Sequence, residues 1–172
     1  MHPLHQLAAA LAARDVRYIL MGVAAVNYWA TAAAQIFSTQ DYDLLLPVDA
    51  DNLLRAWQGC EQCGLALLAG GDLLDAVRDH LLAERVLAAR AVTRATDGQG
   101  FDVDLSFEMA GFDFSTVWEA RRIFKVEGAE LPVARLRQIV ESKARAGRAK
   151  DRLFLATHAE ALRQLLGDEK PT

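Results

Sequence analysis

Cysteine is scarce in this sequence, with only Cys60 and Cys63 among 172 residues. Two cysteines exclude a disulfide framework. Their C-x-x-C spacing has no second pair and no strand–helix context of the thioredoxin type. We therefore interpret them as small residues near a helix end rather than as a zinc or redox site. The four histidines are scattered, and none has the spacing of a metal ligand.

Charge is also missing from residues 18–40, yet we do not interpret this stretch as a membrane span. It contains several polar residues and is rich in alanine rather than leucine, which favours a strand, a turn and a buried helix. The N-terminal segment has no lysine or arginine before its apolar run, and residues 14–17 interrupt that run, so it does not resemble a signal peptide. We expect no membrane partner and a cytoplasmic location.

No internal repeat, low-complexity tract or linker divides the chain, which is 52% apolar and 24% charged, as is typical of a globular protein. The length fits one domain over residues 1–172, with residues 135–166 as a C-terminal helical extension. A net charge of −4 argues against duplex DNA as a partner. Residues 135–152 are nevertheless strongly basic, which predicts either a solvated helix face or a surface for a triphosphate, an RNA end or an acidic partner.

Hydrophobic periodicity predicts an α+β fold: a small mixed β-sheet with helices packed on it and a C-terminal helical tail. Helices are predicted over residues 4–13, 24–34, about 50–63, 72–83, 135–146 and 150–166. Strands are predicted over residues 16–21, 41–46, 85–93, 101–107, 121–126 and 131–133, with a hairpin turn at 97–100.

Paired aspartates in the pattern D-x-D occur at residues 41/43, 49/51 and 102/104. The pair at 49/51 follows Pro47, where aspartate is expected as a helix cap. The other two pairs lie on predicted strands, whose two-residue period puts both carboxylates of a pair on one face. Like charges on one face of a sheet repel, so the pattern predicts either a divalent cation between them or a solvated face.

Gly22 ends a predicted strand and precedes a predicted helix. A glycine at such a turn lets backbone amides approach an anion such as a phosphate, although an ordinary tight turn also uses glycine. With the aspartate strands it adds weight to a metal and phosphate site.

Three segments, in this order along the chain, resemble the nucleotidyltransferase fold shared with polymerase beta: Ile19–Ala25 (ILMGVAA), Thr39–Leu44 (TQDYDL) and Val103–Leu105 (VDL). The seven-residue step from Asp104 to Gly111 is similar to that of the smaller members. The tail Lys143–Asp151 (KARAGRAKD) resembles the ending of minimal and AbiEii-like bacterial nucleotidyltransferases, several of which belong to toxin–antitoxin systems.

The resemblance implies a Mg²⁺-dependent enzyme that moves a nucleoside monophosphate from a nucleoside triphosphate to a hydroxyl on a protein or RNA acceptor. Two Mg²⁺ ions would be held by Asp41 and Asp43, while Asp104 would share one metal and help deprotonate the acceptor hydroxyl. Asp102 lies on the same predicted face and is the alternative to Asp104, which we prefer. The nucleotide would contact Gly22, Val23, Thr39, Lys143 and Arg148.

Three residues depart from the family's pattern. Val23 stands where relatives usually have Ser or a second Gly, Phe37 where many have Arg, and Phe154 where many have a second Asp. A Val would be strained if its position needed a positive φ. Val23 and Phe37 favour an alternative function, a binding module that keeps the fold, has lost catalysis and contacts a toxin, an antitoxin or another protein. Carboxylates that bind a metal only structurally are a third hypothesis.

Overall fold

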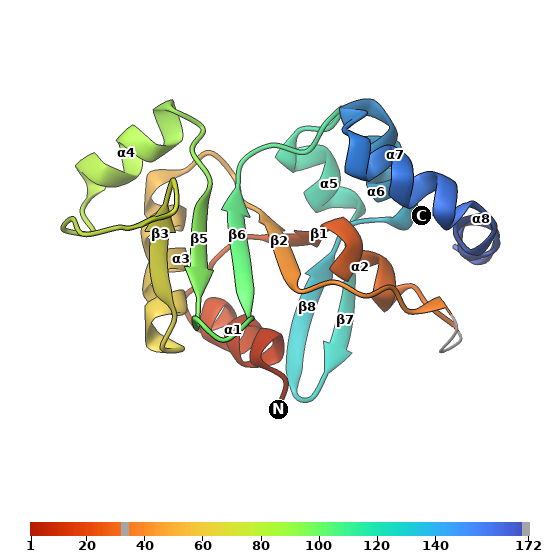
Figure 1. Cartoon of the computed structure of the whole chain (residues 1–172). Helices are drawn as coiled ribbons and strands as arrows, with labels where there is room; N and C mark the ends of the chain where they lie inside the picture. The colour runs from red at the N-terminus through yellow and green to blue at the C-terminus, as the bar shows by residue number, and fades with distance from the viewer. Residues whose placement is uncertain (32–34, 170–172) are drawn as a thin grey trace.

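A mixed eight-stranded sheet forms the centre of the computed structural model, which describes residues 1–31 and 35–169 (Figure 1). The strands are β1 (Ile19–Met21), β2 (Asp41–Leu45), β3 (Ala66–Ala69), β4 (Asp72–Leu73), β5 (Thr93–Thr96), β6 (Asp102–Ser106), β7 (Arg122–Val126) and β8 (Ala129–Val133). Their order across the sheet is β4-β3-β5-β6-β2-β1-β8-β7. The β2–β6 and β1–β8 pairs are parallel and the other pairs antiparallel. The predicted α+β class is confirmed, with a larger sheet than expected.

The helices of the described residues are α1 (Pro3–Ala12), α2 (Gly22–Tyr28), α3 (Ala50–Gln62), α4 (His80–Ala88), α5 (Phe114–Ala120), α6 (Leu136–Ala146), α7 (Ala149–Thr157) and α8 (Ala159–Asp168). Helices α1 and α3 pack against each other, α1 on β8 and α3 on β3 and β5. Helix α2 contacts β1, β2 and α6, and α7 and α8 pack on α6. The C-terminal helices thus gather at one end of the molecule, away from α4 (Figure 1).

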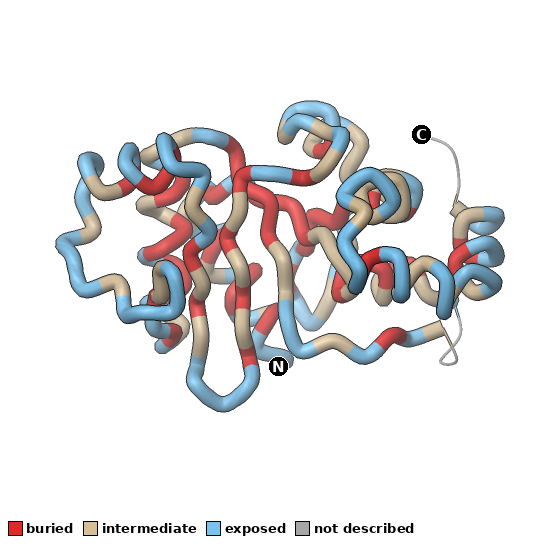
Figure 2. Tube along the Cα trace, turned by 45° about the horizontal axis from the view of Figure 1, so that its top comes forward, coloured by how far each residue is buried: buried red, intermediate tan, exposed pale blue. Residues whose placement is uncertain are grey.

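The core lies along the central strands, as the buried segments in Figure 2 show. Leu44 of β2 and Val103 and Leu105 of β6 are fully buried. Burial alternates strictly along β6, as the sequence period predicts, while the tip of the β5–β6 hairpin is exposed. The aspartates of β2 and β6 therefore lie on the face of the sheet opposite these core residues.

The predicted helix over residues 72–83 is wrong. Gly70 and Gly71, with φ of +61° and +90°, turn the chain from β3 into the short strand β4 instead. Helix α4 begins only after Asp79, whose side chain accepts a hydrogen bond from the Leu82 N–H at 2.9 Å.

The predicted strand over residues 85–93 is also wrong. Its alanines favour a helix, and α4 continues to Ala88. The strand of this region starts at Thr93, because the hairpin turn at 97–100 aligns residues 93–96 with β6. The turn itself is where the sequence predicts it.

Two helix boundaries differ from the prediction. Helix α2 ends at Tyr28, short of the predicted 24–34, and residues 32–34 lie outside the described part of the chain. The single helix predicted over 150–166 is divided at His158 into α7 and α8. Strand β3 and the seven-residue helix α5 were not predicted, since both are too short to show a clear period.

Helix α3 confirms the structural interpretation of the second aspartate pair. Asp49 caps the helix by accepting a hydrogen bond from the Asn52 N–H at 2.9 Å. Cys60 and Cys63, at the end of this helix, are both free thiols. Nowhere in the described residues does a helix have the length and apolar character needed to cross a bilayer.

Candidate active site

Two rows of aspartates project from one face of the sheet. The parallel pairing of β2 with β6 aligns Asp41 with Asp102 and Asp43 with Asp104. Neighbouring strands lie about 4.8 Å apart, so these carboxylates are close neighbours. We call Asp41, Asp43 and Asp104 the aspartate floor.

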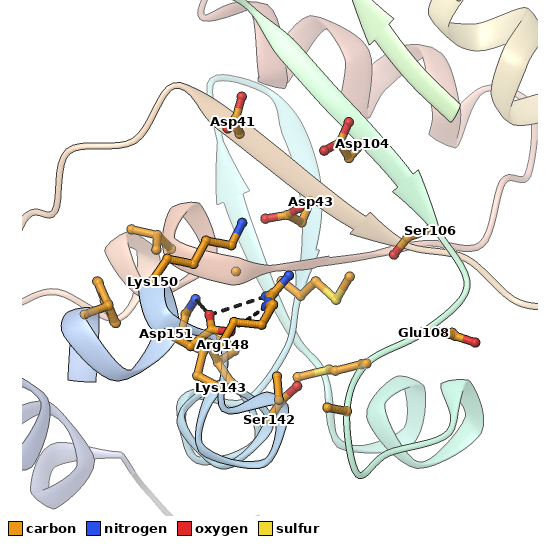
Figure 3. Close-up of a pocket in the computed structure, with 18 of the residues that line it drawn as sticks. Asp41, Asp43, Asp104, Ser106, Glu108, Ser142, Lys143, Arg148, Lys150 and Asp151 are labelled. Atoms are coloured by element: carbon orange, nitrogen blue, oxygen red, sulfur yellow. Dashed lines mark hydrogen bonds and ion pairs between the residues drawn. The ribbon is translucent and has the colours of Figure 1, made fainter. Parts of the chain in front are cut away.

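A cavity of about 640 Å³ opens over the aspartate floor (Figure 3). Every residue that the sequence predicts for the site lines this cavity: Asp41, Asp43, Asp104, Gly22, Val23, Thr39, Lys143 and Arg148. Asp102 is not among the residues that line it. The structure brings the eight residues together, and their catalytic and binding roles stay predictions.

The backbone of Gly22 approaches the Asp43 side chain of the floor closely. It has a φ of +75°, and a Cβ at this position would lie 2.3 Å from Asp43 Oδ2. Only glycine therefore fits between β1 and α2 at this point. Val23 lies inside α2 and has no positive φ. The strain considered for Val23 is absent because the left-handed conformation falls on Gly22.

Three cations face the aspartate floor across the cavity, and we call them the cationic wall. They are Lys143 of α6, Arg148 in the turn after α6, and Lys150 at the start of α7. Gly147 ends α6 with a left-handed φ of +61°, which allows the chain to turn there. Figure 3 shows the Lys150 side chain directed toward Asp43.

Asp151 holds two of these cations in place. Its side chain is 1% exposed and accepts hydrogen bonds from Lys143 Nζ at 3.2 Å and from Arg148 Nε at 2.6 Å. Burial acts to raise the pKa of Asp151, but the hydrogen bonds from Arg148 and Lys143 outweigh it and hold the pKa below its ordinary value. Lys143 and Arg148 therefore share one side of the α6–α7 pair, which their spacing in the sequence left open.

The pKa of Asp43 is shifted in the opposite direction to that of Asp151. Burial raises the pKa of Asp43, and the charge of Asp104 raises it further, while Lys143 and Lys150 act in the other direction. The pKa lies above its ordinary value, so ionised Asp43 is short of compensating positive charge. An added cation next to Asp43 would stabilise its charged form.

Arg94 is a site residue that sequence reasoning missed. It pairs with Asp104 across β5 and β6 and lines the cavity. Its guanidinium donates from Nε to Asp104 Oδ1 at 2.7 Å and from Nη2 to Oδ2 at 2.8 Å, while Nη1 lies 3.5 Å from Asp102 Oδ2. The hydrogen bond to Asp104 raises the pKa of Arg94. A strand predicted over the residues just before the 97–100 turn would have put Arg94 opposite Asp104 in the hairpin.

Cationic side chains of the protein balance the charge of the aspartate floor only in part. With the side chains oriented as they are in residues 1–31 and 35–169, no three His, Cys, Asp or Glu residues form a ready-made metal-binding cluster. Arg94 donates hydrogen bonds to both oxygens of Asp104, while Lys143 and Lys150 offset part of the rise in the Asp43 pKa. The donor set still fits a hard divalent ion, because the floor offers carboxylate oxygens beside a wall that can hold phosphates.

Phe37 and Phe154, two of the departures from the family's pattern, contact each other. Their ring centroids lie 5.4 Å apart in an edge-on arrangement, and His158 packs against both rings. The Asn27 side chain holds the Phe37 backbone through two hydrogen bonds of 2.7 and 2.8 Å. Lys143 Nζ lies 5.1 Å from the Phe154 ring centroid. The two departures thus form one contact between the segment before β2 and the cationic wall.

The chain has the nucleotidyltransferase fold. One solved structure that it resembles is the antibiotic-resistance factor ANT(2'')-Ia, with a TM-score of 0.56 and 14% identity over 95% of this chain and 86% of that one. Another is an antigenic nucleotidyltransferase-like protein from Paracoccidioides brasiliensis, with a TM-score of 0.52 and 19% identity over 96% of this chain and 74% of that one. No family model and no curated protein matches the sequence. The predicted fold is confirmed, and the minimal or AbiEii-like subtype stays a prediction.

Proposed function

We propose that this chain is a Mg²⁺-dependent nucleotidyltransferase that moves a nucleoside monophosphate from a nucleoside triphosphate to a hydroxyl on a protein or RNA acceptor. The observation that carries this proposal is a single cavity in which the aspartate floor faces the cationic wall. A metal-bound triphosphate needs both surfaces, carboxylates for the metal and cations for the phosphate oxygens. The structural likeness to the nucleotidyltransferase-like protein from Paracoccidioides brasiliensis supports the same class of reaction.

In this proposal Asp41 and Asp43 would hold two Mg²⁺ ions, and Asp104 would share one of them. Bound Mg²⁺ would supply charge neutralisation and polarise the attacked phosphate. The raised pKa of Asp43 supports its assignment, since the ionised group lacks full compensation from the protein alone.

The chain's own groups orient the triphosphate. Lys143, Arg148 and Lys150 bind its terminal phosphate oxygens, with Asp151 keeping the first two in position. Gly22 and Val23 offer backbone N–H groups on the side next to Asp43. The Thr39 hydroxyl donates to the Asp41 carbonyl at 3.1 Å, so Thr39 fixes the approach to β2 as well as lining the cavity.

The transfer is an in-line displacement. The acceptor hydroxyl oxygen forms a bond to the α-phosphorus, the bond from that phosphorus to the bridging oxygen breaks, and pyrophosphate leaves. The hydroxyl proton passes to the Asp104 carboxylate. Positioning and charge neutralisation supply most of the rate enhancement in such a site.

Label transfer tests the proposal. The protein is incubated with Mg²⁺, a cell lysate and each of the nucleoside triphosphates labelled at the α-phosphate. We expect transfer of label to a protein or RNA, and at least a roughly hundredfold loss in Asp43→Asn. Asp51→Asn is the matched control, because Asp51 belongs to a D-x-D pair outside the cavity. Absence of transfer with all four ribonucleotides and all four deoxyribonucleotides contradicts the proposal.

The second candidate function is a binding module on the same fold, with a toxin, an antitoxin or another protein as its partner. The occupation of Asp104 by Arg94 favours it, because both carboxylate oxygens already accept hydrogen bonds from the guanidinium and are not free for a metal or an acceptor hydroxyl. Isothermal titration with Mg²⁺ and a non-hydrolysable triphosphate separates the two candidates. Micromolar binding supports the enzyme, and no binding supports the module.

A further inference from the structure

We propose that Arg94 competes with the metal for Asp104, so that Asp104 joins a metal site only after Arg94 has released it. This inference rests on the proposed function, since it concerns the metal that this function requires. It gives Arg94 a positioning role, through Asp104, that neither the fold nor the family resemblance assigns.

The Arg94 guanidinium engages the whole carboxylate of Asp104. Nε and Nη2 of Arg94 lie 2.7 and 2.8 Å from the two oxygens of Asp104, so one fork occupies both ends of the carboxylate. The two residues are direct partners across antiparallel strands, which holds the fork in register. The side chains are 38% and 22% exposed, so the pair is accessible from the cavity and can exchange partners.

The three carboxylates of the floor are not equivalent. Within the described part of the chain, neither Asp41 nor Asp43 has a side-chain ion pair, whereas Asp104 has two hydrogen bonds to Arg94. A metal can therefore approach Asp41 and Asp43 directly. Sharing the same metal with Asp104 would place a divalent charge beside the guanidinium, and the two cations would repel each other.

Assembly of the site would then be ordered. Asp41 and Asp43 contact the metal first, and Asp104 follows when the metal replaces the positive charge that Arg94 provides. Until that exchange, both carboxylate oxygens of Asp104 are engaged by the Arg94 guanidinium, so Asp104 is not free to accept the proton of an acceptor hydroxyl. This order reconciles the occupied Asp104 with its proposed part in proton transfer.

Mn²⁺ binding to the full chain, measured by electron paramagnetic resonance of the free ion, tests the competition. Arg94→Met keeps much of the side-chain volume and removes the fork. We expect Arg94→Met to bind Mn²⁺ roughly five- to tenfold more tightly than wild type, the range expected for the loss of a charge-assisted competitor. In the Arg94→Met/Asp104→Asn double variant this gain should disappear. Arg94→Lys, which keeps the charge but not the fork, should fall between wild type and Arg94→Met.

A second readout does not depend on the methionine variant folding. In the wild-type chain, the Nε–H resonance of Arg94, assigned by its loss in Arg94→Lys, should shift on addition of Mg²⁺ as the hydrogen bond to Asp104 is released. Thermal unfolding followed by circular dichroism checks that each variant is folded.

The outcomes separate this inference from the proposed function. If Asp43→Asn weakens Mn²⁺ binding but Arg94→Met binds no more tightly than wild type, and the Arg94 resonance does not shift, Arg94 supports Asp104 and the competition is wrong. If Asp43→Asn binds Mn²⁺ as wild type does, the proposed metal site fails and the competition fails with it.

Discussion

The two sides of the cavity are built in different ways. The aspartate floor is positioned by the backbone, since the pairing of β2 with β6 sets where Asp43 and Asp104 lie. The cationic wall depends on a side chain, since the buried carboxylate of Asp151 holds Lys143 and Arg148. Changes to floor side chains should therefore affect chemistry more than folding, while loss of Asp151 should affect both.

The two sides also respond to pH in opposite directions. Asp151 has a pKa below its ordinary value of 3.8, so it stabilises the fold above that value and the contribution is lost as the pH falls through the lowered pKa. Asp43 has a raised pKa, so its contribution to stability declines as the pH rises from 3.8 through the raised pKa. At neutral pH, ionised Asp151 therefore stabilises the folded state, whereas ionised Asp43 destabilises it.

Asp151→Ala tests this difference with the largest expected effect on stability. It leaves the partly buried Lys143 without its partner, while Arg148 is 61% exposed and can be solvated. We expect the free energy of unfolding at pH 7 to fall by about 2–3 kcal/mol, less than for a fully buried pair. Urea unfolding measures this, and the gap to wild type should narrow as the pH is lowered through the Asp151 pKa.

Glu160→Ala is the matched control for this variant. Glu160 and Arg163 form an ion pair of the same i,i+3 spacing, with both side chains mostly exposed. Its loss should change stability by less than about 0.5 kcal/mol. Equal losses of stability in Asp151→Ala and Glu160→Ala would show that the buried ion pairs of Asp151 stabilise the fold no more than an exposed ion pair does.

Gly22→Ala alters the floor without changing its charge. The added Cβ would need to lie 2.3 Å from Asp43 Oδ2 at a φ of +75°, so the backbone or Asp43 must move. We expect a loss of about 1–2 kcal/mol in stability, together with weaker Mn²⁺ binding.

Gly167→Ala provides the comparison for that substitution. Gly167 lies in α8 with open space around it, so alanine should be neutral or stabilise by up to about 1 kcal/mol. If Gly22→Ala matched wild type in stability and in Mn²⁺ binding, the close approach of the β1–α2 turn to Asp43 would be required for neither.

The floor could be predicted from the sequence and much of the wall's support could not. The alternation in residues 101–107 sets which side chains face the cavity, because a strand has only two faces. Predicting the contact of Arg94 with Asp104 required the register of β5 against β6. The alanine-rich segment before β5 obscured where that strand begins. Asp151 sits in a basic helical segment, and its burial depends on how α7 packs on α6. The contact of Phe37 with Phe154 joins segments far apart in the chain, so no local pattern reports it.

That aromatic contact joins the segment before β2 to helix α7, and it gives the smallest predicted effect. A double-mutant cycle with Phe37→Leu and Phe154→Leu, measured by urea unfolding, should give a coupling energy of roughly 0.5–1.5 kcal/mol. Phe37→Leu combined with Leu153→Ala is the control. Leu153 neighbours Phe154 in sequence but is 68% exposed, so that pair should show no coupling.

The cycle also bears on the alternative of lost catalysis. Suppose that Phe37 and Phe154 are coupled and Phe37→Leu weakens triphosphate binding as well as stability. The two departures would then act together to join the approach to β2 with the cationic wall, which favours a working site. A coupling energy near zero would instead leave the segment before β2 and helix α7 energetically independent. The departures would then be unrelated substitutions, as expected of a binding module that no longer needs a triphosphate held between the two sides.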